Sequence, residues 1–226
     1  MYLKKLPMDK LIDFHTHHYK PNHTNIISYD VAKFSEVKND YFTIGIHPWW
    51  IQEQKIKQLE ELLITQYNKS TFFGLGEMGL DKIRNKQKYQ KQQEVFEAQL
   101  NLALKYKIKT IILHNVKSHS DTLRILKQTG FNNNIILHDY HGNEETLNQY
   151  AKLCHIYPSF KANFICHNSK SSMLTQIPFD SILIETDDDL SVSLEKGYEA
   201  LAKLFNLSTD QVVQSMYNKF RKLKQN

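Results

Sequence analysis

The feature that most constrains this chain is a series of short apolar runs, rich in Ile, Leu, Phe and Tyr, that recurs along the whole sequence. Strands that are buried on both faces have continuous apolar sequences, because helices cover both sides of the sheet. The segments between the runs are polar and carry apolar residues at three- and four-residue steps, which is typical of amphipathic helices. Alternation of this kind, repeated about eight times, predicts a closed parallel barrel rather than an open sheet.

The expected elements can be placed on the sequence. We expect strands at residues 11–14, 25–29, 41–46, 71–75, 110–113, 134–137, 155–160 and 181–185, of which 25–29 is the weaker pattern. We expect helices at residues 53–68, 88–106, 121–129, 143–152, 193–204 and 208–222. Gly130 follows the third helix as a stop signal, and Ser208 opens the last one with capping-box spacing. The prediction is an α/β protein, a TIM (β/α)8-type barrel in which residues 1–226 form a single domain.

Length and composition limit the remaining classes. The chain has 226 residues, 41% of them hydrophobic, which is enough for one sizeable core. No apolar stretch reaches the roughly 18 residues of a spanning helix, and the N-terminus lacks a signal-peptide pattern, so we expect a cytoplasmic protein without a membrane partner. Cys154 and Cys166 lack disulfide or metal-site spacing and are expected to be buried thiols. The net charge of +5 is compatible with an anionic substrate, and the oligomeric state stays open, with a monomer as one alternative.

The most informative polar residues stand where apolar runs end. Five runs are followed, directly or within two residues, by residue types that bind metal ions. The C-terminal ends of all strands in a parallel barrel open on one face, so these side chains are predicted to converge. A single histidine there could be a hydrogen-bonded structural residue and a single acid could cap a helix, but five such strand ends together favour a metal site. The predicted ligands are His15, His17, Glu77, His114, His138 and Asp187.

These residue types suit one or two divalent cations. His15 and His17 alternate along a strand, so both imidazoles lie on the same side. Glu77 can bridge two cations with its two oxygens, and Asp187 can bind a cation and also accept a proton from bound water. A divalent cation lowers the pKa of its water toward roughly 7. Glu77 and Asp187 are therefore the predicted catalytic residues. Histidines favour Zn, Co, Ni or Fe and carboxylates permit Mg or Mn, so the metal stays open.

Several motifs carry a resemblance to a known family. They are His15-x-His17, GIHP at 45–48, GEMGLD at 76–81 and ETD at 185–187, together with the two strand-end histidines. In this order they resemble the TatD family of metal-dependent deoxyribonucleases, which belongs to the amidohydrolase-like barrels. The likeness covers nearly the whole chain and extends to MYNKFRKL at 216–223. It implies a divalent-metal phosphodiesterase that acts on DNA.

The resemblance also implies a role for each motif. One metal would be surrounded by His15, His17, Glu77 and Asp187, and the other would be held by Glu77, His114 and His138. His47 in GIHP looks like the family's phosphate-facing histidine, with ordering of the loop beside Pro48 as the alternative. Asp187 would take the proton of the attacking water.

Other residues near the predicted mouth have two interpretations each. Three of them follow strands and could contact a phosphate, with simple loop solvation as the alternative: His119, His141 and Lys161. Trp49 and Trp50 follow GIHP and could stack a base, or pack over a helix as a lid.

The chain departs from the family pattern in several places. Asp188 and Asp189 follow ETD where a short residue and a proline are usual, and they either crowd acids at the mouth or form the N-cap region of the next helix. The usual arginine after His114 is absent, with Lys117 and His119 as candidates to replace it, and Asp139-Tyr140 replaces a cysteine–phenylalanine pair. The segment before GIHP is also short, which indicates a compact branch of the family.

Three functions follow from these observations. The first is a DNA-cleaving phosphodiesterase, and the second is a related barrel hydrolase acting on a small phosphoester, lactone or amide, because the same metal pair activates water for all of these. The third is a catalytically silent metal-binding or interaction protein. The intact ligand set argues against this third function, since a silent member would be expected to lose at least one ligand.

Overall fold

The computed structural model describes residues 11–35, 40–52, 54–167 and 172–225. Two sequence predictions fall partly on other residues. The expected absence of a signal peptide concerns the first ten residues, and the first helix is predicted to begin at residue 53, so both of these points lie outside the described residues.

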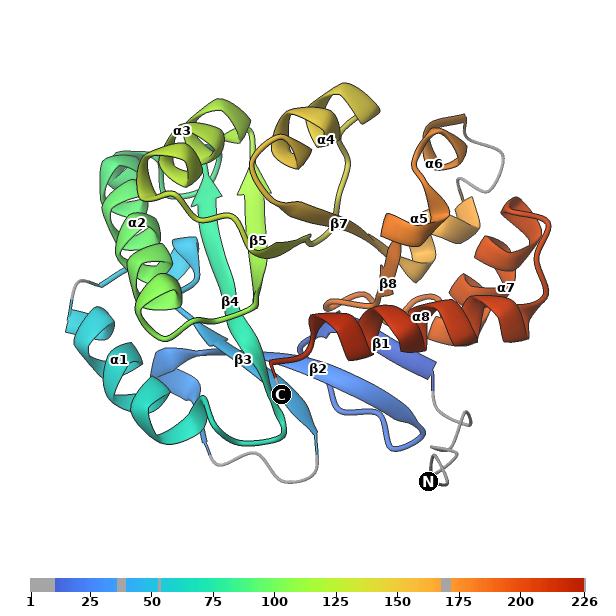
Figure 1. The fold of residues 1–226 in the computed structure, drawn as a ribbon, viewed down its shortest axis with the longest axis horizontal. Helices are drawn as coiled ribbons and strands as arrows, with labels where there is room; N and C mark the ends of the chain where they lie inside the picture. Colours follow the sequence, from blue (N-terminus) through green and yellow to red (C-terminus); the bar gives the residue numbers. More distant parts are fainter. Residues whose placement is uncertain (1–10, 36–39, 53, 168–171, 226) are drawn as a thin grey trace.

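Eight parallel strands follow one another around the sheet in chain order (Figure 1). Each strand pairs in parallel with the next. All eight predicted strands are therefore present, and the weak one at 25–29 is extended at both ends. The strands are β1 (Leu11–Thr16), β2 (His23–Asp30), β3 (Tyr41–Gly45), β4 (Phe72–Asp81), β5 (Thr110–Val116), β6 (Asn134–Leu137), β7 (His155–Lys161) and β8 (Leu183–Glu185).

The last strand returns to the first at the C-terminal ends of both. Thr16 and Asp187 form a parallel bridge. The Asp187 amide donates a hydrogen bond to the His15 carbonyl at 2.9 Å, and the His17 amide donates to the Asp187 carbonyl at 3.3 Å. The sheet is thus a near-closed parallel barrel, as predicted, and the contact that joins its edges involves three of the predicted metal ligands.

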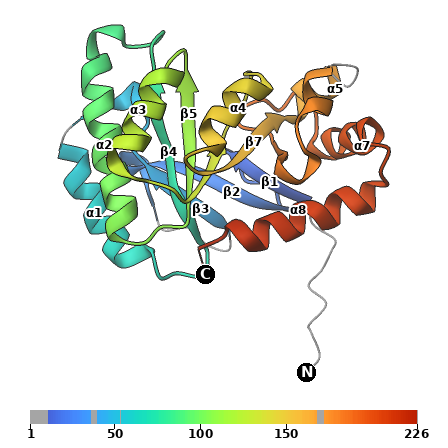
Figure 2. The ribbon, with the colours of Figure 1, turned by 45° about the horizontal axis from the view of Figure 1, so that its top comes forward.

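Helices cover the outside of the barrel (Figure 2). The six predicted helices are confirmed, and two short ones, α5 and α6, are additional. Gly130 ends α3 with a positive φ of 71°, and Ser208 and Gln211 form a complete capping box at the start of α8, as their spacing predicts. The helices are α1 (Gln54–Gln66), α2 (Tyr89–Lys105), α3 (His119–Thr129), α4 (Glu144–Ala151), α5 (Ala162–His167), α6 (Ser172–Gln176), α7 (Leu194–Leu204) and α8 (Thr209–Leu223).

The first part of the barrel does not follow the expected alternation of strand and helix. Residues 17–22 join β1 to β2 without a helix, whereas parallel strands usually need a crossover of about a dozen residues. After β2 only a short 3-10 helix, Val31–Lys33, is present among the described residues before β3. The regular alternation of strand and helix is therefore incomplete after β1 and β2 in the described residues, where the sequence analysis placed no helix either. The link between β1 and β2 is too short for a crossover helix and contains Pro21.

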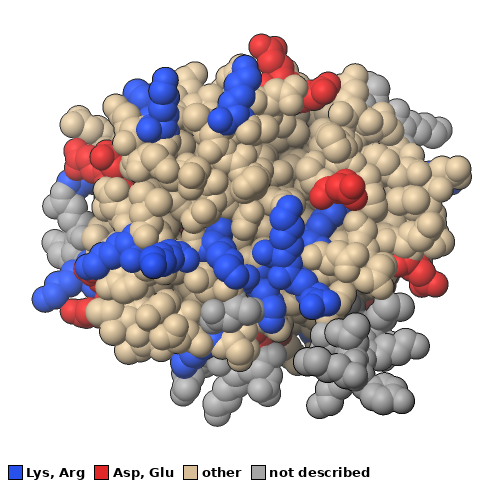
Figure 3. Space-filling model, viewed as in Figure 1, with Lys and Arg blue, Asp and Glu red and all other residues tan. Residues whose placement is uncertain are grey.

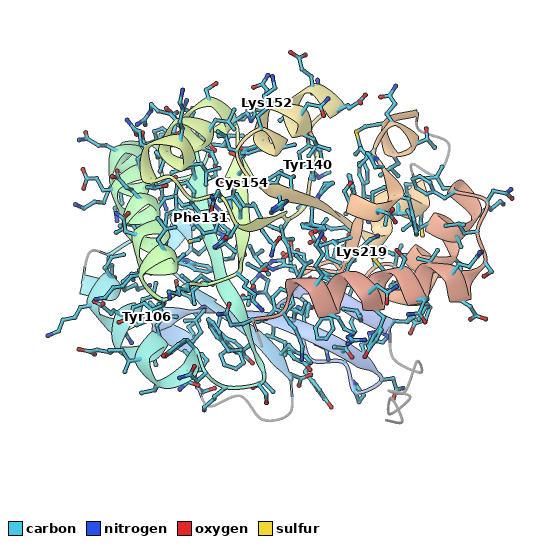
Figure 4. All side chains as sticks on the ribbon, viewed as in Figure 1. Tyr106, Phe131, Tyr140, Lys152, Cys154 and Lys219 are labelled. Atoms are coloured by element: carbon cyan, nitrogen blue, oxygen red, sulfur yellow. The ribbon has the colours of Figure 1, made fainter. Side chains whose placement is uncertain are left out.

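Buried polar side chains tie the elements together beneath the site. The Tyr198 hydroxyl of α7 accepts from the Ile12 amide at 3.1 Å and donates to its carbonyl at 2.9 Å. Lys219 of α8 is buried and donates to the carbonyls of Phe179 and Ile182 (Figure 4). Cys154 is also buried, and burial raises the pKa of its thiol to about 12, so it is an unreactive packing residue.

Basic side chains gather on one face, over the C-terminal end of α8 and the neighbouring end of α2 (Figure 3). This face lies at the N-terminal ends of the strands, since the Thr110 hydroxyl at the start of β5 donates to the Leu223 carbonyl. The metal ligands stand at the opposite ends of the strands, so this patch does not form part of the site. Within the described residues, no helix is both long and apolar enough to cross a bilayer.

Candidate metal centre

Two irregularities in strand register aim ligands into the barrel. β1 carries one residue more than β2 between Asp13 and Thr16, and β4 carries one more than β5 between Leu75 and Met78. Such bulges redirect side chains, and these two contain His15 and Glu77. Gly79 permits the close approach of β4 to β5, because a Cβ there would lie 2.0 Å from the carbonyl oxygen of His114. The GEMGLD segment therefore has the glycine that this strand packing requires.

The first set of ligands, the β1–β8 ligand group, consists of His15, His17 and Asp187. Asp187 Oδ1 lies 3.5 Å from His15 Nε2 and 3.4 Å from His17 Nε2. Glu77 Oε2 lies 3.4 and 3.5 Å from the same two nitrogens. A tetrahedral cation with bonds of about 2.0–2.2 Å separates its ligands by about 3.3–3.6 Å. The spacing of these four atoms therefore fits a cation held between them.

The second set, the β5–β6 ligand group, consists of His114 and His138 and faces the other oxygen of Glu77. Glu77 Oε1 lies 2.7 Å from His114 Nδ1 and 2.8 Å from His138 Nε2. His47 Nε2 lies 3.0 Å from the same oxygen. Each oxygen of Glu77 thus faces its own set of imidazoles, and the contacts in this second set have hydrogen-bond distances, which are shorter than the separation of two ligands on one cation.

Unpartnered atoms support the fit to a cation. His15 Nε2 is fully buried and has no hydrogen-bond partner among the described residues. Buried polar groups without a partner are uncommon, and a metal ligand is one explanation for them. The other ring nitrogen of His15 lies 3.0 Å from the Ser28 hydroxyl, which in turn contacts Thr43 at 2.7 Å. His17 Nδ1 lies 3.2 Å from the Ser28 carbonyl, so Nε2 of each ring is directed at the site.

A family comparison identifies the chain. A sequence profile described as "TatD related DNase" matches residues 15–225. The chain belongs to this family. The predicted resemblance to this family is thus confirmed.

Known relatives agree with this assignment. An uncharacterized metal-dependent hydrolase of Buchnera aphidicola is 34% identical over 158 residues, which is 66% of this chain and 56% of that protein, little more than half its length. A putative deoxyribonuclease TATDN1 homolog of Enterocytozoon bieneusi is 27% identical over 191 residues, 77% of this chain and 64% of that protein. The crystal structure of the TatD homolog YjjV from Escherichia coli has the same fold, with a TM-score of 0.79 and 18% identity over 97% of this chain and 99% of that one.

The electrostatics of this TatD-family site are dominated by its two acids. Burial favours the neutral carboxyl of Glu77, but the surrounding imidazoles, His138 foremost, outweigh burial and hold its pKa well below the usual value. Burial likewise opposes ionisation of Asp187, yet the imidazoles of His15 and His17, at 3.5 and 3.4 Å, lower its pKa. Both carboxylates are therefore ionised at neutral pH and available to a cation.

The pKa values of His17 and His138 are raised by nearby acids. Burial lowers the pKa of His17, but Asp187 and Glu77 outweigh it and raise the pKa to about 10. Burial also lowers that of His138, while Glu77 and Glu185 raise it well above its usual value. Without a metal, these imidazoles carry protons that balance the two acids. A cation must displace the protons, because only a neutral imidazole nitrogen can bind it.

We therefore expect metal affinity to rise with pH. Between pH 6 and 8 the dissociation constant should fall by about tenfold per pH unit for each proton released. Isothermal titration calorimetry in buffers of different ionisation enthalpy measures both the affinity and the number of protons. A dissociation constant that does not change with pH would contradict this account of the site.

His47 performs one of the two tasks considered for it, the ordering of the loop beside Pro48, and its contact with a phosphate stays a prediction. Its Nδ1 accepts a hydrogen bond from the Trp49 amide at 3.1 Å, so it orders the start of the 3-10 helix Pro48–Trp50. The ring proton is then on Nε2, which faces Glu77 Oε1 at 3.0 Å. Burial lowers the pKa of His47, and this effect exceeds the opposing influence of Glu77. His47 therefore presents a neutral N–H donor to the site.

Two acids that the sequence analysis did not assign support the ligands from behind. Asp81 lies 3.4 Å from His114 Nε2 and accepts from the Trp49 indole at 2.7 Å. Glu185 is fully buried and lies 3.5 Å from His138 Nδ1. Carboxylates in such positions fix the orientation of a ligating imidazole. The sequence could have indicated this role, since Asp81 is the last residue of the GEMGLD motif and Glu185 is the first residue of the ETD motif.

A cavity of about 610 Å³ opens over the ligands. Lys161 lines it, but its amine is already surrounded by acids, at 2.9 Å from Asp187 Oδ2 and 3.1 Å from Asp139 Oδ2. Burial lowers the pKa of Lys161, while Asp187 and Asp139 raise it, so it is a cation. Lys161 thus holds the second oxygen of Asp187 while the first faces the histidines. Its contact with a phosphate stays a prediction.

The remaining predicted substrate contacts lie beside this cavity rather than in its lining. His119 is the first residue of α3, and its Nε2 lies 2.8 Å from Gln149. His141 is exposed and its Nε2 lies 3.0 Å from Asp139. Both line a neighbouring pocket that also includes His114 and His138. Their phosphate contacts, like that of Lys117 in the same pocket, stay predictions.

The extra acids after ETD do not cap the next helix. Ser193 is the N-cap of α7, with its side chain accepting from the Lys196 amide. Asp189 instead accepts from the Ser191 amide at 2.9 Å and from the Asn163 side chain at 2.8 Å, so it fixes the preceding turn. Asp188 is largely exposed and lies 3.7 Å from Lys161. The interpretation of these acids as the N-cap region is therefore wrong.

Proposed function

We propose that this TatD-family hydrolase is a divalent-metal phosphodiesterase that cleaves DNA. The observation that carries the proposal is the position of Glu77, whose two oxygens each face a separate set of imidazoles. Two cations about 3.5–4 Å apart are typical of enzymes that cleave phosphoesters. The family name and the putative deoxyribonuclease from Enterocytozoon bieneusi support DNA as the phosphoester.

The chain's own residues divide into two binding sets. Glu77 with the β1–β8 ligand group would hold one cation, and Glu77 with the β5–β6 ligand group would hold the other. Bound there, divalent cations supply an acidified water and neutralise negative charge on a phosphoryl group. Zn, Mg, Mn, Ni and Co are all compatible with this mixture of nitrogen and oxygen ligands.

Two side chains handle the substrate and the proton. Asp187 is ionised and lies at the cavity wall, so it can accept a proton from the attacking water. His47 offers a neutral N–H donor in the same cavity, and this donor suits a phosphate oxygen. We assign proton transfer to Asp187 and phosphate orientation to His47. Lys161 orients Asp187 through the ion pair between them.

The experiment that tests this proposal starts with the metal. Elemental analysis of the purified chain should find at least one equivalent of a divalent metal. With the metal that is found added to the assay, the protein should shorten a labelled single-stranded DNA oligonucleotide, and a chelator should stop the reaction. A small chromogenic ester serves as the comparison substrate. Hydrolysis of the ester without any cleavage of DNA would favour a small-molecule hydrolase instead.

A further inference from the structure

Exposed apolar side chains concentrate around the mouth of the barrel. The structure has five large exposed hydrophobic residues within its described ranges. One, Ile64, lies on α1, and the other four stand shortly after the C-terminal ends of strands. Loops that leave these ends surround the mouth. The four are Tyr19, Trp50, Ile83 and Leu190. An apolar rim is unexpected for a site that takes only phosphate, and it fits a substrate with flat apolar parts.

The two adjacent tryptophans are held in different ways. Trp49 donates its indole N–H to Asp81 at 2.7 Å, and Arg84 covers its ring at 3.8 Å from the centroid. Its ring also contacts His114 edge-on, with centroids 5.5 Å apart. The Trp49 side chain is therefore occupied by contacts within the protein, and it helps to fix the position of His114.

The Trp50 ring has an exposed face, whereas its backbone is held by a hydrogen bond. It is 45% exposed and lines the cavity. Its carbonyl accepts from Lys55 at 3.0 Å, and the amine of Lys55 pairs with Asp30 at 2.8 Å, an ion pair of low exposure. The ring centroid lies 5.1 Å from that of His47. A rigid aromatic surface therefore stands next to the residue that faces Glu77, within reach of a nucleotide bound there.

We propose that Trp50 is a base-stacking subsite, on which a nucleobase next to the cleaved phosphodiester rests. The inference rests on the proposed function, because it names where the DNA substrate binds the same site. Base stacking on an aromatic ring typically strengthens binding about 5- to 150-fold and tolerates any base, since every base has a flat face.

The Lys33 amine covers the face of the Trp50 ring that a base would use. This amine lies 4.7 Å from the ring centroid, and the Lys33 side chain is exposed. A cation at an exposed aromatic face strengthens binding only about 2- to 5-fold, which is less than base stacking. A base therefore displaces this amine. The displaced cation remains in the cavity lining, where it meets the phosphate of the same nucleotide.

The first test compares two oligonucleotides that differ only by one base. One has a natural terminal nucleotide and the other has an abasic residue in its place. The wild-type protein should show a lower KM for the natural one, by about 5-fold or more. Trp50→Ala should remove this preference, so that its KM is the same for both oligonucleotides, and Trp50→Phe should keep most of it. Equal KM values in the wild-type protein would overturn the subsite while leaving the DNase proposal intact.

The second test does not depend on turnover. The chain has two tryptophans, so Trp50→Phe leaves Trp49 as the sole tryptophan. A deoxynucleoside monophosphate should quench tryptophan fluorescence in the wild-type protein and leave Trp50→Phe almost unaffected, whereas deoxyribose phosphate should quench neither. If no oligonucleotide is cleaved, the DNase proposal fails and this measurement alone decides the subsite. Equal quenching in both proteins, or none in the wild type, would overturn it.

Discussion

Replacing Glu77 with glutamine is expected to lower kcat/KM by about 10³-fold or more on any substrate that the protein hydrolyses. The change keeps the shape of a buried side chain and removes the negative charge that faces both ligand groups. Loss of about 4 kcal/mol of stabilisation by the metals in the transition state corresponds to this factor. Metal content should fall in the same variant, because a neutral amide is a weaker ligand for a divalent cation than a carboxylate.

The matched control is Glu94→Gln, which removes an exposed partner of Lys91 on α2. A surface pair of this kind contributes about 0–1 kcal/mol to stability, so activity and metal content should stay near the wild-type values. Steady-state kinetics, elemental analysis and circular dichroism on the three proteins check the prediction. Full activity of a folded Glu77→Gln protein would rule out the role assigned to the carboxylate.

The position of the ligands was predictable because each stands at or near the end of an apolar run. His114 and His138 come directly after apolar runs, and a parallel barrel has only one face on which such residues can meet. The inference required no knowledge of angles or distances. For this reason a sequence pattern was sufficient to bring together residues separated by most of the chain.

Contacts between strand ends could not be predicted in the same way. The sequence places Lys161 after a strand, but it does not show that Asp139 and Asp187 come from the two strand ends on either side of it. Lys161, for which contact with a phosphate and loop solvation were both considered, forms ion pairs with these acids. Similarly, the ring proton of His47 depends on a backbone amide two residues away, a local geometry that residue types do not specify.

The path of the chain from β1 to β2 could not be predicted, for another physical reason. An apolar run predicts a strand but carries no information about the path that leads to the next one. The link at 17–22 contains a bend and then a turn, which the His23 amide closes by donating to the Lys20 carbonyl at 3.2 Å, and the apolar runs on either side do not show this. The functional result is that side chains of β2 and of the 3-10 helix after it, including Lys33, line the cavity.

Asp187→Asn is expected to reduce kcat by about 10²- to 10⁴-fold, the range that loss of a general base produces. Asparagine keeps the size of the side chain and tolerates the positive φ of 53° at this position, so the bridge to Thr16 should form as before. Alanine would lose activity too, but it adds backbone strain of about 1–2 kcal/mol and would mix a folding effect with a chemical one.

Measuring both metal content and kcat of Asp187→Asn distinguishes the role of Asp187 in proton transfer from its role as a metal ligand. Glu77 and the β5–β6 ligand group are unchanged, so one equivalent of metal should remain bound, and the melting temperature should stay near that of the wild type. Asp188→Asn is the matched control, since Asp188 is the adjacent, largely exposed acid and belongs to neither ligand group. Its activity should change only a few-fold. If Asp187→Asn kept its metal and also kept wild-type kcat, another group would have to accept the proton of the water, and Glu77 would be the remaining ionised carboxylate within the ligand set.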